Sequence, residues 1–348
     1  MTFFTSLFFL IQAAWVYVFD LERTNIDLHQ LAASFDNPRF LGQIITLALP
    51  IMGAYLITPR IFHEHPIASN LKLLIFFSTW SLVIATGTRG TWLAICVVTL
   101  ISCLTGAIAR RWLLLQLFGV AAGLALTSLL VYVIPQSLKL TIYNPPGERL
   151  HLGLSAREII WAQAWEMIQS APWLGNGPMH FAQLHSVAGA HPHQLLLQFA
   201  AEWGLLATAC MCALTGWALV AMLRRMVLWQ KQRHAHAALY IGLSTAVAAS
   251  LVQSMVDGVW VMPYTQTALT AVAALAFALH HEKALAAFRA RPLNAWDKCY
   301  TVALLGAVVI LLYSLYPGSS TSLHNALIRF EELPHGDFKP RFWIQGFI

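Results

Sequence analysis

The 348-residue chain is 58% hydrophobic and only 10% charged, and its formal net charge is +6. Apolar runs of about 16 to 22 residues recur along it, close to the length that crosses the hydrocarbon core of a bilayer. This composition excludes an ordinary soluble domain. In so apolar a chain, we interpret the net positive charge as a determinant of membrane topology and of contact with anionic lipid, and not as a nucleic-acid-binding surface.

The predicted fold is an all-α, polytopic bundle of about nine transmembrane helices with one large helical loop. The expected spans are residues 3–19, 41–58, 71–86, 91–108, 113–134, 194–223, 237–256, 264–280 and 299–316. The first is expected to be a retained span, because it has neither a preceding basic region nor a small-residue cleavage site. Without repeats or Gly/Ser linkers, residues 1–348 are expected to form a single membrane domain. The five cysteines lie in or beside spans, which predicts neither disulfides nor a zinc site.

The orientation of the chain in the membrane follows from its lysines and arginines, because cytoplasmic loops carry an excess of these residues. If successive spans alternate in direction, most of these residues lie on one side, and the opposite short loops hold only Arg23, Arg39 and Arg89. The amino terminus is therefore expected inside. The loop at residues 135–193 and the tail at residues 317–348 are expected on the outer, periplasmic side.

The outer loop contains its own helix signal. Residues 155–158, Ser-Ala-Arg-Glu, have the form of a capping box and predict a helix start. The following apolar residues recur at helical spacing and predict a stripe that lies against the membrane surface or the bundle: Trp161, Ala164, Trp165 and Ile168. Residues 172–178, rich in proline and glycine, predict the turn that ends this helix.

Two arginines lie at expected outer helix ends. Arg157 falls in the first turn of the loop helix, where the helix dipole disfavours a cation and an external anion would relieve the mismatch. Alternatively it pairs with Glu158 or reaches lipid phosphate. Arg89 lies between two spans in the sequence Gly-Thr-Arg-Gly, where backbone amides can approach a ligand and a guanidinium can bind phosphate oxygens. The alternative for Arg89 is an arginine that snorkels from a tight hairpin.

The segment at residues 191–194, His-Pro-His-Gln, opens the sixth expected span. It places the imidazoles of His191 and His193 at the water boundary, where a neutral ring can accept a proton from a hydroxyl. No third ligand follows at helical spacing, so a metal site is not expected. The alternative is a histidine pair that only satisfies helix-end groups.

Two acidic residues are candidates for supporting roles. Glu202 lies on nearly the opposite side of the sixth span from His193, so it is expected to brace the bundle or a polar neighbour, with a catalytic role left open. Asp257 falls in a short outer hairpin, where turn chemistry explains it and orientation of an arginine is the alternative.

These motifs resemble, in order and spacing, those of the O-antigen ligase and O-antigen polymerase superfamily, which includes the bacterial protein O-oligosaccharyltransferases. The resemblance rests on residues 35–40, 88–94, 157–161, 174–177, 191–194 and 202–205. Two features depart from the family pattern. Gln194 stands where the family has Asn, and several amino-terminal spans of full-length members are missing, so the resemblance implies a shortened member.

The resemblance implies a metal-independent, inverting glycosyltransferase without a cofactor, in the bacterial inner membrane with a periplasmic active face. Its donor would be a glycan on undecaprenyl pyrophosphate. The acceptor hydroxyl would belong to the lipid A core for a ligase, to another lipid-linked glycan for a polymerase, or to a pilin-like protein for an oligosaccharyltransferase. The outer tail is similar to that of the last branch.

The implied site has two parts. Arg89 and Arg157, with Arg149 as a third cation, would bind the pyrophosphate, whose charge needs fixed cations in the absence of magnesium. His193, or else His191, would activate the acceptor hydroxyl. A lipid or solute transporter and a non-catalytic membrane subunit of a glycan assembly complex are the alternatives from other classes.

Overall fold

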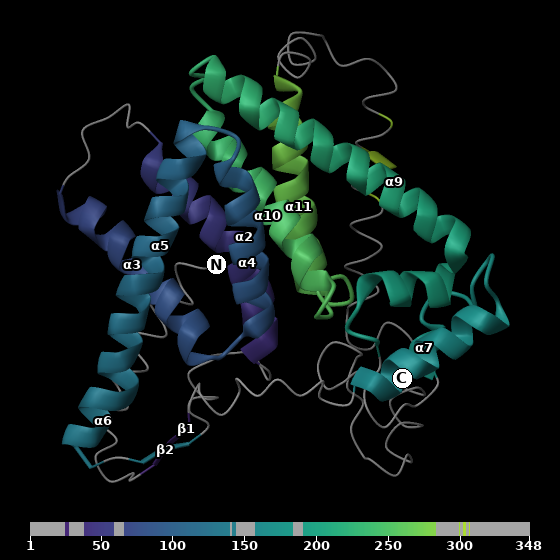
Figure 1. Ribbon diagram of the computed structural model, residues 1–348, viewed down its shortest axis with the longest axis horizontal. Coiled ribbons are helices and arrows are strands. Elements are labelled where there is room, and N and C mark those ends of the chain that lie inside the picture. The colour runs from purple at the N-terminus through teal and green to yellow at the C-terminus, as the bar shows by residue number, and fades with distance from the viewer. Residues whose placement is uncertain are drawn as a thin grey trace.

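The computed structural model describes residues 25–27, 38–58, 66–139, 141–143, 157–183, 191–282, 299, 302–303 and 306. Its main elements are helices (Figure 1). Those that correspond to expected spans are α2 (Pro38–Ile57), α3 (Pro66–Ala85), α4 (Arg89–Cys103), α5 (Ala107–Thr127), α9 (Leu195–Lys231), α10 (Ala237–Ser254) and α11 (Pro263–His280). The expected first span and tail, and most of the expected last span, lie outside the described residues.

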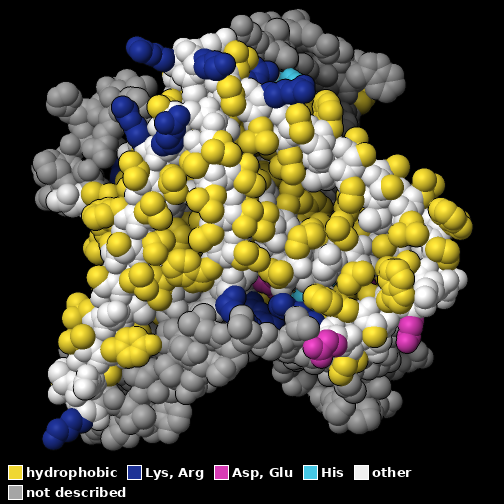
Figure 2. Space-filling model, in the orientation of Figure 1, with side chains coloured by type: hydrophobic (Ala, Val, Ile, Leu, Met, Phe, Trp, Pro, Cys, Tyr) yellow, Lys and Arg dark blue, Asp and Glu magenta, His cyan; other side chains and the backbone are white. Residues whose placement is uncertain are grey.

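Four segments are long and apolar enough to cross a membrane: Arg39–Ile57, Ala107–Ser137, Leu195–Lys231 and Ala237–Ser254. Two shorter helices, Asn70–Ala85 and Arg89–Cys103, are also apolar. Apolar side chains cover the broad middle of the molecule, and Lys and Arg gather toward its two ends (Figure 2). The chain is therefore a helical membrane protein, while the count of nine spans stays a prediction.

The structure departs from the expected elements in two details. The turn between α4 and α5 lies at residues 104–106, so Arg110 and Arg111 fall inside α5 and not in a loop. In addition, the short strands β1 (Asn25–Asp27) and β2 (Thr141–Tyr143) pair in parallel, which the all-α expectation did not include. Between α5 and β2, the helix continues through a π-helical segment, Ser128–Val133, into α6 (Ile134–Ser137).

The central helix of the bundle is α10, which packs against α2, α4, α9 and α11. Small residues on α10 are buried and let the neighbouring helices approach closely, among them Gly242, Ala246, Ala249 and Ser250. The carboxyl end of α10 consequently lies near the amino ends of α2, α4 and α11. This arrangement delivers residues 253–258 to the end of the bundle at which the expected outer motifs lie.

The loop helix forms where the capping-box pattern predicted it. It is α7 (Arg157–Ser170), and it packs with the short α8 (His180–Gln183) on the first part of α9. Its buried residues, Ile160, Ala164, Met167 and Ile168, contact Phe181, Ala200 and Ala201. The stripe therefore faces a bundle helix. Trp165 takes no part in this packing and is 56% exposed.

Candidate functional site

Three arginines lie in the first turns of three helices that start at the same end of the bundle. Arg39 follows the first residue of α2, while Arg89 and Arg157 begin α4 and α7. Burial lowers the pKa of the Arg157 guanidinium from its ordinary value, and the charges of Arg39 and Arg89 lower it further, whereas Asp257 raises it. An arginine with a reduced pKa still stays charged near neutral pH. The site therefore gathers three cations, each where the helix dipole already favours an anion.

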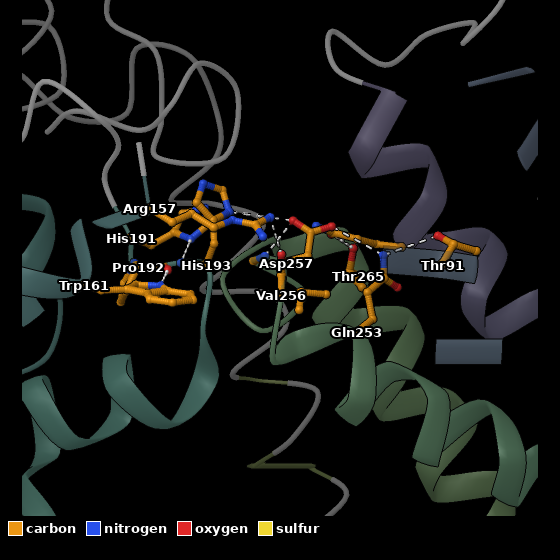
Figure 3. A network of polar contacts seen from close by, with 12 residues as sticks. Thr91, Arg157, Trp161, His191, Pro192, His193, Gln253, Val256, Asp257 and Thr265 are labelled. Carbon is orange, nitrogen blue, oxygen red and sulfur yellow. Dashed lines mark hydrogen bonds and ion pairs between the residues drawn. The ribbon is translucent and has the colours of Figure 1, made fainter. Parts of the chain in front are cut away.

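The backbone fixes Arg157 at this site. Its Nη2 donates to the carbonyl oxygen of Val256 at 2.8 Å. One turn later on α7, Trp161 Nε1 donates to the carbonyl oxygen of Pro192 at 2.9 Å. A single face of α7 thus binds both the segment after α10 and the segment before α9 (Figure 3).

The two histidines of residues 191–194 have different environments. His191 is buried, and its Nδ1 accepts a hydrogen bond from the backbone N–H of His193 at 3.2 Å. Because that nitrogen accepts, a neutral His191 ring carries its proton on Nε2, where it can only donate. The His193 ring lies 3.9 Å from the His191 ring, centroid to centroid, and its side chain is 21% exposed. His193 is therefore the histidine that a substrate can reach.

His193 is held in an uncommon backbone conformation. Its φ is 52°, in the left-handed region that non-glycine residues seldom adopt. Hydrogen bonds on both sides enforce this conformation, since the carbonyl of Pro192 accepts from Trp161 and the side chain of Gln194 accepts from the N–H of Leu197. Gln194 is the N-cap of α9. Gln194 therefore performs the capping for which asparagine is usually preferred.

Asp257 is the acidic partner of His193. Its Oδ1 lies 3.8 Å from His193 Nδ1, which is an ion-pair distance longer than a hydrogen bond. The same oxygen accepts from the N–H of Gly258 at 2.7 Å. The alternative, in which Asp257 orients an arginine, also has support, because the Asp257 charge raises the pKa of Arg157.

A chain of buried polar groups supports the other carboxylate oxygen. Gln253 Nε2 lies 3.4 Å from Asp257 Oδ2 and 3.4 Å from Thr91 Oγ1. Thr91 Oγ1 in turn donates to the carbonyl oxygen of Gly42 at 3.0 Å. Residues of α2, α4 and α10 therefore fix the position of Asp257, as Figure 3 shows for Thr91 and Gln253.

Gly258 permits the close approach of the Asp257 turn to the histidines. A Cβ atom at this position would lie 2.3 Å from Cε1 and 2.7 Å from Nε2 of His191. Any side chain here would push the imidazole away or move the turn. The glycine that follows Asp257 is therefore required by packing against His191.

Glu202 belongs to a different part of the structure, the junction of α9 with the turn after α7. The carbonyl oxygen of Glu202 accepts from the N–H of Gly177 at 2.9 Å, and that of Ala201 accepts from the N–H of Asn176 at 3.0 Å. Two residues later α9 is interrupted at Gly204, where φ is 82°. Residues 174–177, Leu-Gly-Asn-Gly, and residues 202–205, Glu-Trp-Gly-Leu, are thus joined by backbone hydrogen bonds. This joint fixes the carboxyl end of α7 on α9 and so helps to position Arg157.

The described residues bring together most of the site that the sequence predicted. Arg157, His191, His193 and Asp257 are joined by contacts or ion-pair distances, and Arg89 by its charge. Arg149 lies outside the described residues. Sequence reasoning missed Arg39 as a site cation, although it shares with Arg89 and Arg157 the position in a first helical turn.

Residues 74–212 match the family model described as O-Antigen ligase, a segment that runs from α3 into α9 and includes Arg89, Arg157, His191 and His193. Arg39 and Asp257 lie outside the matched segment. No curated protein and no solved structure matches the chain. Residues 74–212 therefore carry the O-antigen ligase family domain, in agreement with the superfamily that the motifs resemble.

Proposed function

We propose that the chain transfers a glycan from undecaprenyl pyrophosphate to an acceptor hydroxyl on the periplasmic side of the bacterial inner membrane. The family domain supports the general class, a membrane glycosyltransferase of the O-antigen ligase or polymerase type. The lipid A core or a pilin-like protein is the proposed acceptor. The observation that carries the proposal is the convergence of three helix-terminal arginines beside a histidine and aspartate pair.

The arginines suit the leaving group of this reaction. When the bond between the anomeric carbon and the pyrophosphate oxygen breaks, negative charge develops on the lipid pyrophosphate. Guanidinium groups bind phosphate oxygens with a planar pair of donors, and helix amino termini add backbone N–H groups and a favourable dipole. Arg39, Arg89 and Arg157 would thus stabilise the departing anion, with Arg149 as a further cation.

The histidine and aspartate suit the nucleophile. As the acceptor oxygen attacks the anomeric carbon from the face opposite the pyrophosphate, its proton passes to Nε2 of His193. Nδ1 of the same ring faces Asp257, whose negative charge stabilises the imidazolium that forms. His191 is less suited to this role, because its Nδ1 is occupied by the N–H of His193. Bond making and bond breaking on opposite faces invert the sugar carbon and involve only groups of this chain.

Three other functions remain as alternatives. A polymerase would use the same site with a second lipid-linked glycan as acceptor. A non-catalytic subunit or a transporter would keep the cations for binding but would have no need of the His193–Asp257 pair. The pair is the feature that favours an enzyme.

Glycan transfer in a bacterial strain that lacks its own ligase tests the proposal. The intact chain, Arg89→Ala and His193→Ala are compared at matched membrane levels, and lipopolysaccharide and secreted proteins are both probed for product. We expect product from the intact chain on one acceptor and loss in both variants. His193→Ala should retain binding of the lipid donor, whereas unchanged product in that variant would exclude the proposed chemistry.

A further inference from the structure

The joint between α7 and α9 replaces a helical hydrogen bond of α9. In an unbroken helix the N–H of Leu205 would donate to the carbonyl of Ala201, four residues earlier. Because α9 is interrupted at Gly204, the N–H of Leu205 donates instead to the carbonyl of Pro172, in the turn after α7, at 2.7 Å. The carbonyl of Ala201 accepts from the N–H of Asn176 at 3.0 Å. The two segments therefore exchange backbone partners.

The side chain of Asn176 bridges the two helices at this joint. Its Nδ2 donates to the carbonyl of Met167, in the last turn of α7, at 2.8 Å, and to the carbonyl of Ala201 on α9 at 3.1 Å. Its Oδ1 accepts from the hydroxyl of Ser170 at 3.1 Å. With its backbone N–H, Asn176 thus makes four hydrogen bonds that connect the end of α7 to the break in α9.

Two helical arms lead from this joint to the candidate site. One arm is α7, which runs back to Arg157 over 14 residues, about 20 Å at the rise of an α-helix. The other is the first part of α9, residues 195–204, which runs back toward His193 over about 15 Å. The arms lie side by side (Figure 1). Arg157 and His193 therefore lie at the far ends of two arms that meet near Asn176.

The other half of the site belongs to the bundle. Arg89 begins α4, and Asp257 follows α10. The site is therefore formed between the bundle and the α7 unit, which comprises α7 and residues 191–204, and the angle at the joint sets its width. A rotation of about 5° there would move the far end of an arm of about 20 Å by about 2 Å. Misplacement of a reacting group by about 1 Å can cost about 100-fold in rate.

Apolar packing alone does not fix this angle. Ile160 and Ala164 of α7 pack with Ala200 of α9 in one apolar cluster. Hydrophobic burial is non-directional, whereas a hydrogen bond weakens steeply as its angle departs from linear. The bonds of Asn176 therefore set the direction in which α7 lies on α9.

We propose that Asn176 is a positioning residue, which holds Arg157 and His193 in place against the bundle half of the site without contacting the substrate. What these two residues do there rests on the proposed function. An amide is needed at position 176 because it donates and accepts at once. An aspartate would direct a carboxylate at two carbonyl oxygens and leave both without this donor.

Distances within the full chain test this role without any substrate. Spin labels are attached at Ala162→Cys on α7 and Thr267→Cys on α11, both exposed, in a chain whose five free cysteines are replaced by alanine. Pulsed electron paramagnetic resonance then gives the distance between the labels. We expect one narrow distribution in this parent chain and a shifted or broader one in Asn176→Asp. The control is Gln169→Ala, exposed in the last turn of α7, which should keep the narrow distribution. An unchanged distribution in Asn176→Asp would overturn the proposal.

Binding of polyprenyl pyrophosphate gives a second readout, which distinguishes positioning from general damage to the fold. Asn176→Asp should weaken binding about tenfold in the intact chain and again in Arg89→Ala, but hardly further in Arg157→Ala, because it acts through Arg157. Similar weakening in all three backgrounds would contradict the proposal. If Asn176→Asp fails to insert, Asn176→Ser, which retains one hydroxyl donor, takes its place in both measurements.

The two readouts separate the role of Asn176 from the proposed function. If the intact chain binds no polyprenyl pyrophosphate, the proposed function fails, and the distances alone decide whether Asn176 positions α7. If the chain transfers glycan while Asn176→Asp keeps the distances and the binding of the intact chain, only the role of Asn176 is refuted.

Discussion

The carboxylate of Asp257 faces the imidazole of His193, with Oδ1 3.8 Å from Nδ1. The two residues lie in different segments between helices, one after α10 and one before α9. The hydrogen bond from Gly258 and the Gln253 amide hold the carboxylate, and the left-handed backbone at residue 193 holds the ring. Both partners are therefore positioned by the fold before any substrate arrives.

Replacing Asp257 tests whether the pair does chemistry. Asp257→Asn keeps the shape but removes the charge that would stabilise the His193 imidazolium, so we expect the transfer rate to fall about 10²-fold. Binding of polyprenyl pyrophosphate should not weaken, because the variant removes a negative charge beside Arg157. Rates are measured with saturating lipid donor, and binding is measured separately.

The control for Asp257→Asn is Glu282→Gln. Glu282 pairs with His234 at 2.9 Å near the end of α9 farthest from the site, so its loss should leave transfer unchanged. If Asp257→Asn bound the lipid donor weakly but transferred glycan from bound donor at the normal rate, the role of Asp257 would instead be to position the arginines.

Arg157→Lys tests the geometry of the anion site. Lysine keeps the charge but ends in a single ammonium on a shorter side chain. It therefore lacks the planar set of donors with which Arg157 can hold the Val256 carbonyl and also bind phosphate. Loss of one charged hydrogen bond, about 1.5–3 kcal/mol, predicts roughly 10- to 100-fold weaker binding of polyprenyl pyrophosphate. Binding is measured at fixed ionic strength, with Arg111→Ala as control, since Arg111 is exposed on α5.

Arg39→Ala tests the cation that the structure adds to the site. Its charge acts on Arg157, so removal should weaken binding of polyprenyl pyrophosphate, but less than Arg157→Ala because Arg39 is exposed. The effect should shrink as salt is added, because exposed charges are screened. A variant that binds as tightly as the intact chain at low salt would remove Arg39 from the site.

Hydropathy predicted the helices well and the site only in part. A bilayer forces each spanning segment to be helical and apolar, so the positions of α2, α9 and α10 follow from local sequence. The start of α7 at Arg157 likewise follows from the capping-box pattern. These features need no knowledge of which helices are neighbours.

The rest of the site depends on contacts between helices, which a single sequence does not reveal. The chain from Gly42 through Thr91 and Gln253 to Asp257 joins three helices through side chains that each look like ordinary polar residues in a span. The role of Arg39 likewise depends on α2 starting beside α4. Periodicity likewise placed Trp165 in one stripe with Ala164 and Ile168, but it did not reveal that Trp165 stays exposed while the other two pack against α9.

The break in α9 at Gly204 gives the last prediction, which concerns stability. The residue is buried with φ of 82°, and a Cβ atom there would lie 2.2 Å from the carbonyl oxygen of Trp173. Gly204→Ala therefore combines a strained backbone with a clash against backbone, and it should destabilise the protein by at least about 1–3 kcal/mol.

Gly216→Ala is the matched control in the same helix, because nothing lies within 4 Å of its Cβ position. Alanine in an exposed helix interior should instead stabilise by roughly 0.5–1 kcal/mol. Thermal unfolding of both variants in detergent should give midpoints that shift in opposite directions from that of the intact chain. Equal midpoints would mean that α9 runs straight through residue 204, and Arg157 would then lack the joint that carries α7 to the site.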